Sequence, residues 1–148
     1  MPDDLPPRLE FSLEEDPDLG TVLVMYGAIE AGDAGRLEAY LESLEAAPDT
    51  VAINSPGGVV NEALDVGRII RARALDTRIL SGMACLSSCP YVLAGGVERH
   101  VSLSGAVGLH QHYYETPCYM PVYFAVSDIQ RSQGVTMGYL IEMGIDPG

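Results

Sequence analysis

Short apolar runs alternate with segments of helical periodicity along most of this chain, and this alternation limits the folds open to it. Residues 21–26, 50–53 and 77–80 are β-type runs. Apolar residues recur at helical spacing in the stretches between them, at residues 37–44 and 63–74. Strands that alternate with helices predict an α/β fold with a parallel sheet, flanking helices and right-handed crossovers.

Other segments complete this outline of the secondary structure. We expect Asp33 to cap the first helix. Residues 82–89 are predicted to form a turn, residues 106–109 a short strand, and residues from 121 onward a helix that breaks near Gly134.

The 148 residues suffice for one domain with a real core. Residues 1–20 are acidic and rich in proline, so we expect a poorly ordered leader followed by a single domain over residues 21–148. The net charge of −13 argues against nucleic acid and anionic membranes as partners, since both need clustered Lys and Arg. No apolar run approaches the roughly 20 residues that span a bilayer.

The first chemical signal is Ser-Pro-Gly-Gly at residues 55–58, between a buried strand and a helix. Gly57 and Gly58 permit a backbone whose N–H groups point at a ligand, so they are candidates for binding an oxyanion. An ordinary strand-to-helix turn would have the same sequence.

The second signal is a pair of serines, Ser87 and Ser88, at a turn into a short helix. Ser87 is a candidate nucleophile and the Ser88 amide a second oxyanion donor, while Ser88 is a competing nucleophile and either serine could simply cap the helix. A serine needs a base, and His110 follows a short strand 23 residues after Ser87, with His112 two residues further on.

Cys85 and Cys89 flank Ser87 and could form a disulfide that braces the turn; an alternative pair is Cys89 with Cys118. The two cysteines with His110 and His112 also give a loose Cys₂His₂ zinc pattern, which remains an alternative. We expect no metal and no cofactor.

Four segments together resemble the proteolytic subunit of the Clp protease and its relatives in the ClpP/crotonase superfamily. They are residues 53–58, 82–88, 93–96 and 108–111. The nearest likeness is to bacterial ClpP-like proteins that are exported or membrane-anchored. The resemblance implies a ClpP/crotonase-like spiral of ββα units that assembles into homo-oligomers.

By this resemblance the chain is a serine peptidase acting on peptides or proteins. Ser87 is the nucleophile, His110 the base, and the amides of Gly58 and Ser88 form the oxyanion hole, with Gly57 shaping the loop. The family's aspartate is not found at its expected distance, and Asp146 is a better candidate than Asp128. We therefore expect a C-terminally incomplete domain. The resemblance implies an exported, periplasmic or membrane-associated location, the last with a membrane anchor outside this chain.

The missing acid motivates a second hypothesis. The chain would then be a catalytically impaired, oligomeric binding module of the same fold. Acyl-CoA chemistry of the crotonase type is a third.

Overall fold

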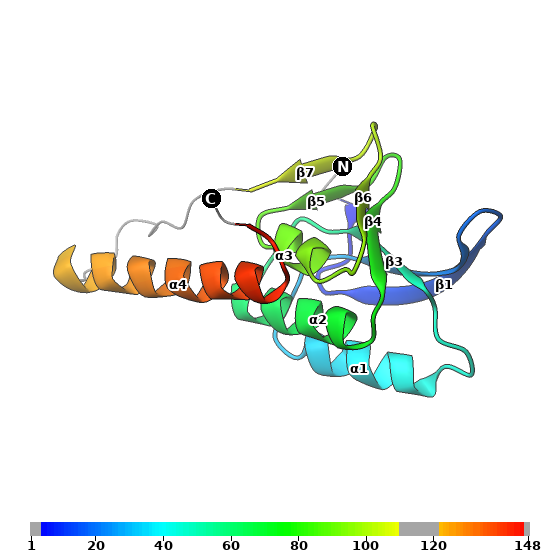
Figure 1. Ribbon diagram of the computed structural model, residues 1–148, viewed down its shortest axis with the longest axis horizontal. Coiled ribbons are helices and arrows are strands. Elements are labelled where there is room, and N and C mark those ends of the chain that lie inside the picture. The colour runs from blue at the N-terminus through cyan, green and yellow to red at the C-terminus, as the bar shows by residue number, and fades with distance from the viewer. Residues whose placement is uncertain (1–3, 110–121, 147–148) are drawn as a thin grey trace. The chain divides into compact units, whose positions relative to one another are not determined.

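The chain divides into two compact units, Met1–Leu109 and His110–Gly148. The computed structural model describes residues 4–109 and 122–146 (Figure 1). The boundary lies within residues 21–148, and the single domain expected there stays a prediction.

Within residues 4–109 the first unit contains seven strands and three helices. The strands are β1 (Glu10–Asp16), β2 (Gly20–Tyr26), β3 (Thr50–Asn54), β4 (Asp76–Ile79), β5 (Ala84–Leu86), β6 (Arg99–Val101) and β7 (Ala106–Gly108). The helices are α1 (Asp33–Ser43), α2 (Val60–Ala72) and α3 (Cys89–Ala94).

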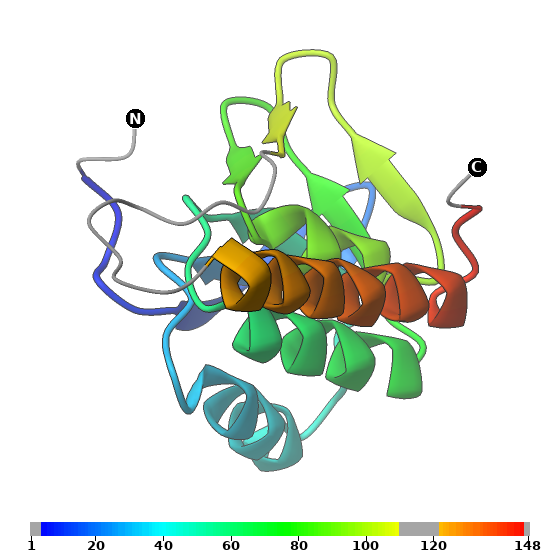
Figure 2. The same ribbon diagram turned by 90° about the vertical axis from the view of Figure 1, so that its left-hand side faces the viewer.

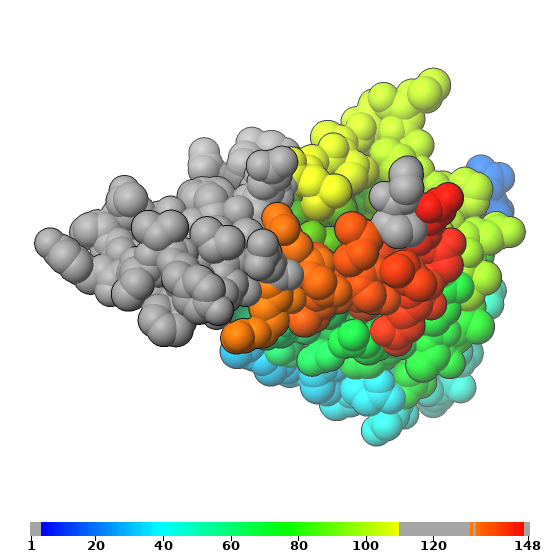
Figure 3. All heavy atoms as spheres, turned by 60° about the vertical axis from the view of Figure 1, so that its left-hand side comes forward, coloured from blue at the N-terminus to red at the C-terminus, as the bar shows by residue number. Residues whose placement is uncertain are grey.

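Two sheets organise the first unit. The larger has the order β1-β2-β3-β4-β6, and every pair in it is parallel except the antiparallel pair β1–β2. The smaller consists of β5 and β7 in parallel. The predicted α/β architecture with a parallel sheet and flanking helices is thereby confirmed. The turn between β6 and β7 projects from the surface (Figure 3), and Leu103 in it is fully exposed.

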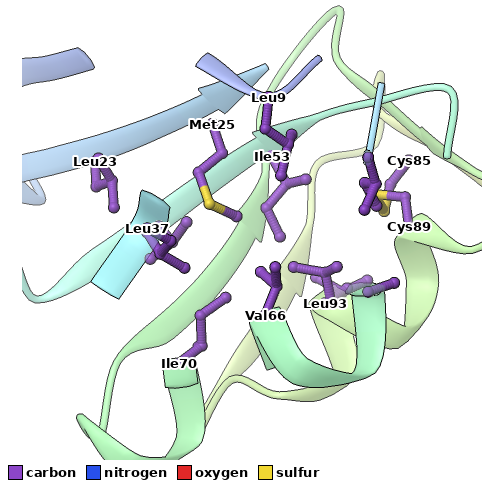
Figure 4. Close-up of a cluster of buried hydrophobic side chains, with 14 of the residues drawn as sticks. Leu9, Leu23, Met25, Leu37, Ile53, Val66, Ile70, Cys85, Cys89 and Leu93 are labelled. Carbon is purple, nitrogen blue, oxygen red and sulfur yellow. A yellow bond between two sulfur atoms is a disulfide. The ribbon is translucent and has the colours of Figure 1, made fainter. Parts of the chain in front are cut away.

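The core lies between one face of the larger sheet and the helices. α1, α2 and α3 stack side by side in one layer (Figure 2). Alternate residues of β2 and β3 point toward this layer because side chains along a strand alternate between its faces. Figure 4 shows Met25 and Ile53 from these strands packed with Leu37 of α1 and Val66 of α2, all at most 1% exposed.

Residues 1–20, predicted to be a poorly ordered leader, contain the edge strand β1. It pairs with β2 from Glu10 opposite Tyr26 to Asp16 opposite Gly20. Leu9, just before it, is 1% exposed and belongs to the core. Backbone pairing and this apolar anchor order the segment despite its acidic composition.

Asp33 does not cap α1, because the N-cap residue is Gly32. Its fully buried carboxylate instead accepts hydrogen bonds from Arg8 at 2.9 Å, Arg36 at 2.8 Å and the Glu30 amide at 2.8 Å. Burial by itself raises the pKa of Asp33, but these hydrogen bonds outweigh it and hold the pKa below its ordinary value. The cluster ties the segment before β1 to the start of α1.

The second unit contains α4 (Val122–Glu142), which continues through Gly134 where the sequence predicts a break. A single glycine costs a helix only about 1 kcal/mol, so neighbouring residues can carry the helix across it. In the parts of the chain that the structure describes, no helix combines the length and apolarity needed to cross a membrane.

Candidate active site

Ser87 occupies a sharp elbow between β5 and α3. It has a φ of 60°, and in the described residues Ala74 is the only other non-glycine residue with positive φ. Its amide donates to the Gly108 carbonyl of β7 at 2.8 Å, which fixes the elbow to the smaller sheet. A left-handed residue costs roughly 1–2 kcal/mol, and strained serines on strand-to-helix turns present their hydroxyls for nucleophilic attack.

The Ser-Pro-Gly-Gly loop, residues 55–58, lies against this elbow. Ser55 extends from β3 and forms a parallel bridge with Cys85; its amide donates to Ala84 at 2.8 Å and its carbonyl accepts from Leu86 at 3.0 Å. These bonds join the loop to β5, the strand that precedes Ser87, so one hydrogen-bond ladder holds both the loop and Ser87.

Gly57 allows the loop to touch Ser87. Its φ is +97°, and a Cβ placed on it would lie 2.7 Å from the Cβ of Ser87 and 2.6 Å from the Leu86 oxygen. Real Cβ atoms do not approach other atoms this closely. No residue with a side chain can therefore replace Gly57 without moving the elbow.

Gly58 is held on two sides. It bridges to Ile29, whose backbone also bonds to the Gly57 oxygen and the Val59 amide, each at 2.9 Å. Its own amide donates to the Ser88 hydroxyl at 2.9 Å, and that hydroxyl donates back to the Gly58 oxygen at 3.1 Å. The amide that the sequence assigns to an oxyanion hole thus has a side-chain partner in this structure.

The contacts distinguish the two serines. Ser88 is 2% exposed and its hydroxyl is engaged by Gly58, whereas Ser87 is partly exposed. Ser88 is also the N-cap residue of α3, yet its side chain makes no hydrogen bond to that helix. Of the two, Ser87 is the more exposed to solvent.

Cys85 and Cys89 are joined by a disulfide, and both are fully buried. The bond connects the middle of β5 to the first residue of α3 and so closes a small covalent ring around Ser87. Disulfide sulfurs are not thiolates, so in this state they cannot hold zinc. Among the described residues no cluster of three or more His, Cys, Asp or Glu could hold a metal.

Several predicted residues fall outside this description. His110, His112 and Cys118 lie outside the described residues, as does the side chain of Asp128. Asp146 is described and exposed, in the second unit. The structure therefore brings together Ser87, Ser88, Gly57, Gly58 and the disulfide.

Two supporting side chains are absent from the sequence-based assignment. The fully buried Ser55 hydroxyl accepts from the Gly57 amide at 3.1 Å, and the Asn54 side chain accepts from the Ala84 amide at 3.1 Å. Asn and Ser side chains commonly form hydrogen bonds to nearby backbone in turns, so these residue types before Pro-Gly indicate that both side chains could bond to backbone. Which backbone they bond to depends on the tertiary fold.

Neither a protein-family model nor a curated protein matches this chain. Its fold resembles that of a solved structure, a mutant of ClpP1 from Listeria monocytogenes, with a TM-score of 0.62 and 18% sequence identity. The match covers 84% of this chain and 73% of that one. The fold is therefore ClpP-like.

Proposed function

We propose that this protein is a serine hydrolase, most simply a peptidase, with Ser87 as its nucleophile. The observation that carries the proposal is the elbow: a serine with positive φ between a strand and a helix, in contact range of a Gly-Gly loop. Backbone conformations of this kind cluster at active sites. The likeness to ClpP1 supports a peptide substrate.

His110 is the proposed base. It follows two residues after Gly108, whose carbonyl accepts the hydrogen bond from the Ser87 amide. His110 comes 23 residues after Ser87, which is the spacing that the resemblance to the Clp proteolytic subunit implies. Histidine is the side chain that most often serves as a general base near neutral pH.

The reaction follows from these roles. Ser87 Oγ gives its proton to His110 and bonds to the substrate carbonyl carbon, and the oxyanion forms hydrogen bonds with the amides of Ser88 and Gly58. The C–N bond breaks as His110 protonates the leaving amine. Water then releases the acyl group by the same steps in reverse order, with His110 again accepting the proton.

The second candidate is a catalytically impaired binding module of this fold. The specific observation in its favour is that the Gly58 amide is bonded to the Ser88 hydroxyl. A non-catalytic protein has no need to keep that amide available.

Labelling of the full chain with a fluorophosphonate probe separates the two. The probe bonds to an activated serine oxygen and releases fluoride, so we expect labelling that is lost in Ser87→Ala. Ser43→Ala, at an exposed serine of α1, is the matched control and should label like the wild type. Equal labelling of the wild type and Ser87→Ala would refute the assignment of Ser87 and favour the binding module.

The proposal includes export to an oxidising compartment, supported by the buried disulfide beside the nucleophile. Free-thiol counting on denatured protein purified from its natural compartment tests this. One reactive thiol, from Cys118, is expected before reduction and three after it; three before reduction would contradict it.

Self-association is a further part of the proposal, supported by the likeness of the fold to ClpP1. Light scattering of the purified full chain tests it. We expect a mass of at least twice the 15.8 kDa of one chain, and a mass of 15.8 kDa at all concentrations would contradict self-association.

A further inference from the structure

The Ser88 hydroxyl lies where it can control the proposed oxyanion hole. It accepts the Gly58 amide proton at 2.9 Å and donates to the Gly58 carbonyl at 3.1 Å, across 30 residues of sequence. An oxyanion that needs the Gly58 amide has to compete with this hydroxyl. The contact is 98% shielded from solvent at Ser88, so water does not readily replace it.

The bond to Gly58 does not compete with a cap bond to α3. Ser88 is the N-cap residue of α3, but its backbone is helical and its side chain makes no hydrogen bond to that helix. Pro90 has no N–H, and the Tyr91 amide donates to the Ser88 carbonyl at 3.1 Å. The motion that releases the Gly58 amide is a rotation about χ1 of Ser88, and serine χ1 has three staggered wells.

We propose that the Ser88 hydroxyl is a positioning residue that gates the oxyanion hole. In the resting state it holds the Gly58 amide; in the reactive state it rotates about χ1 and releases the Gly58 amide to bind the oxyanion. The proposal rests on the function proposed above. By this proposal, the orientation of the Ser88 hydroxyl determines the fraction of molecules in which the Gly58 amide is available to an oxyanion.

Removing the Ser88 hydroxyl tests the gate, because a gate predicts that the labelling rate rises. Ser88→Ala should raise the rate of Ser87-dependent fluorophosphonate labelling by about 2- to 13-fold, which is the factor equivalent to one net neutral hydrogen bond. Ser88→Gly, which also removes the hydroxyl, should do the same. It therefore serves if Ser88→Ala folds poorly.

Ser55→Ala is the matched comparison. It also removes a buried hydroxyl that accepts from this loop, but its donor is the Gly57 amide at 3.1 Å. If each hydroxyl merely stiffens the loop, both Ser55→Ala and Ser88→Ala should label more slowly than the wild type. If Ser88 is a gate, Ser55→Ala should label more slowly and Ser88→Ala faster.

Amide hydrogen exchange gives a readout apart from reactivity. The gate predicts that Ser88→Ala speeds exchange at the Gly58 amide and leaves the Gly57 amide unchanged, measured by NMR on ¹⁵N-labelled full chain. Unchanged exchange at Gly58, or labelling of both Ser88 variants at or below the wild-type rate while Ser87→Ala abolishes labelling, overturns the gate alone. No labelling of any variant overturns the proposed hydrolase, and the gate with it.

Discussion

Replacing Gly57 by alanine should lower the stability of the protein and distort the elbow at Ser87. Gly57 has a φ of +97°, and the added Cβ would lie 2.7 Å from the Ser87 Cβ and 2.6 Å from the Leu86 oxygen. Positive φ costs an alanine roughly 1–2 kcal/mol, and forcing a methyl group into a packed site costs about 1–3 kcal/mol more. Alanine also lowers the conformational entropy of the unfolded chain relative to glycine, which stabilises the folded protein by about 0.4–1 kcal/mol. We therefore expect a net loss of about 2–4 kcal/mol.

Gly82→Ala isolates the steric part of this cost. Gly82 begins the turn before β5 with a φ of +78°, but nothing lies within 4 Å of a Cβ built on it. This control carries the backbone penalty alone, about 1 kcal/mol after the entropy gain. Urea or thermal unfolding should thus rank the wild type above Gly82→Ala and Gly82→Ala above Gly57→Ala.

The two variants should also differ in reactivity. Gly57→Ala pushes the Ser87 side chain and the loop apart, so it should lower fluorophosphonate labelling, whereas Gly82→Ala should leave it near the wild-type rate. Equal stability of the two variants, or full labelling of Gly57→Ala, would show that the loop does not contact the elbow as described.

Three other perturbations have defined outcomes. Replacing Cys85 and Cys89 together by serine should cost about 2 kcal/mol by chemical denaturation, since the ring is small, and should slow labelling by freeing the elbow. Asp33→Asn should cost about 2–3 kcal/mol at pH 7. Because the pKa of Asp33 is lowered by folding, its contribution is complete above its ordinary pKa of about 4 and is lost as the pH falls through the lowered value. The variant should therefore show a shallower loss of stability below about pH 4, and an equally steep acid transition would contradict this. His110→Ala should slow labelling of Ser87 by about 10²- to 10⁴-fold, and a wild-type rate would exclude it as the base.

The parallel sheet could be predicted because its strands are nearly continuous apolar runs followed by helical periodicity. Residues 50–53 illustrate this, since Val51, Ala52 and Ile53 are all at most 1% exposed. β1 could not be predicted in the same way, because its acidic residues face solvent and its order depends on pairing with β2. Local composition does not record such pairing.

Asp33 shows the same limit at a single residue. An aspartate before a helical pattern usually caps the helix, and only the tertiary structure places two arginines against this carboxylate. Its residue type was informative, but its partner Arg8 is 25 residues away in the sequence.

The site was predictable as an assembly of motifs and not as a set of contacts. Ser-Pro-Gly-Gly and the serine pair each signal a turn, and their meeting requires the bridge between Ser55 and Cys85. The Ser88 hydroxyl bonds to Gly58, 30 residues away in the sequence, and not to its own helix, and this choice depends on the tertiary fold. Sequence spacing carries no such information.

The chemistry around Ser87 also constrains what its pH dependence can mean. Residues 54–58 and 84–89 hold no ionisable side chain except two cysteines, which the disulfide prevents from titrating. Backbone amides supply the polar groups that the elbow and the Gly-Gly loop offer to an oxyanion, and amides do not titrate near neutral pH. A labelling rate that changes between pH 5 and pH 8 therefore reports on a group outside these two segments. Loss of that change in His110→Ala would assign the titration to the imidazole, independently of how far the substitution lowers the rate.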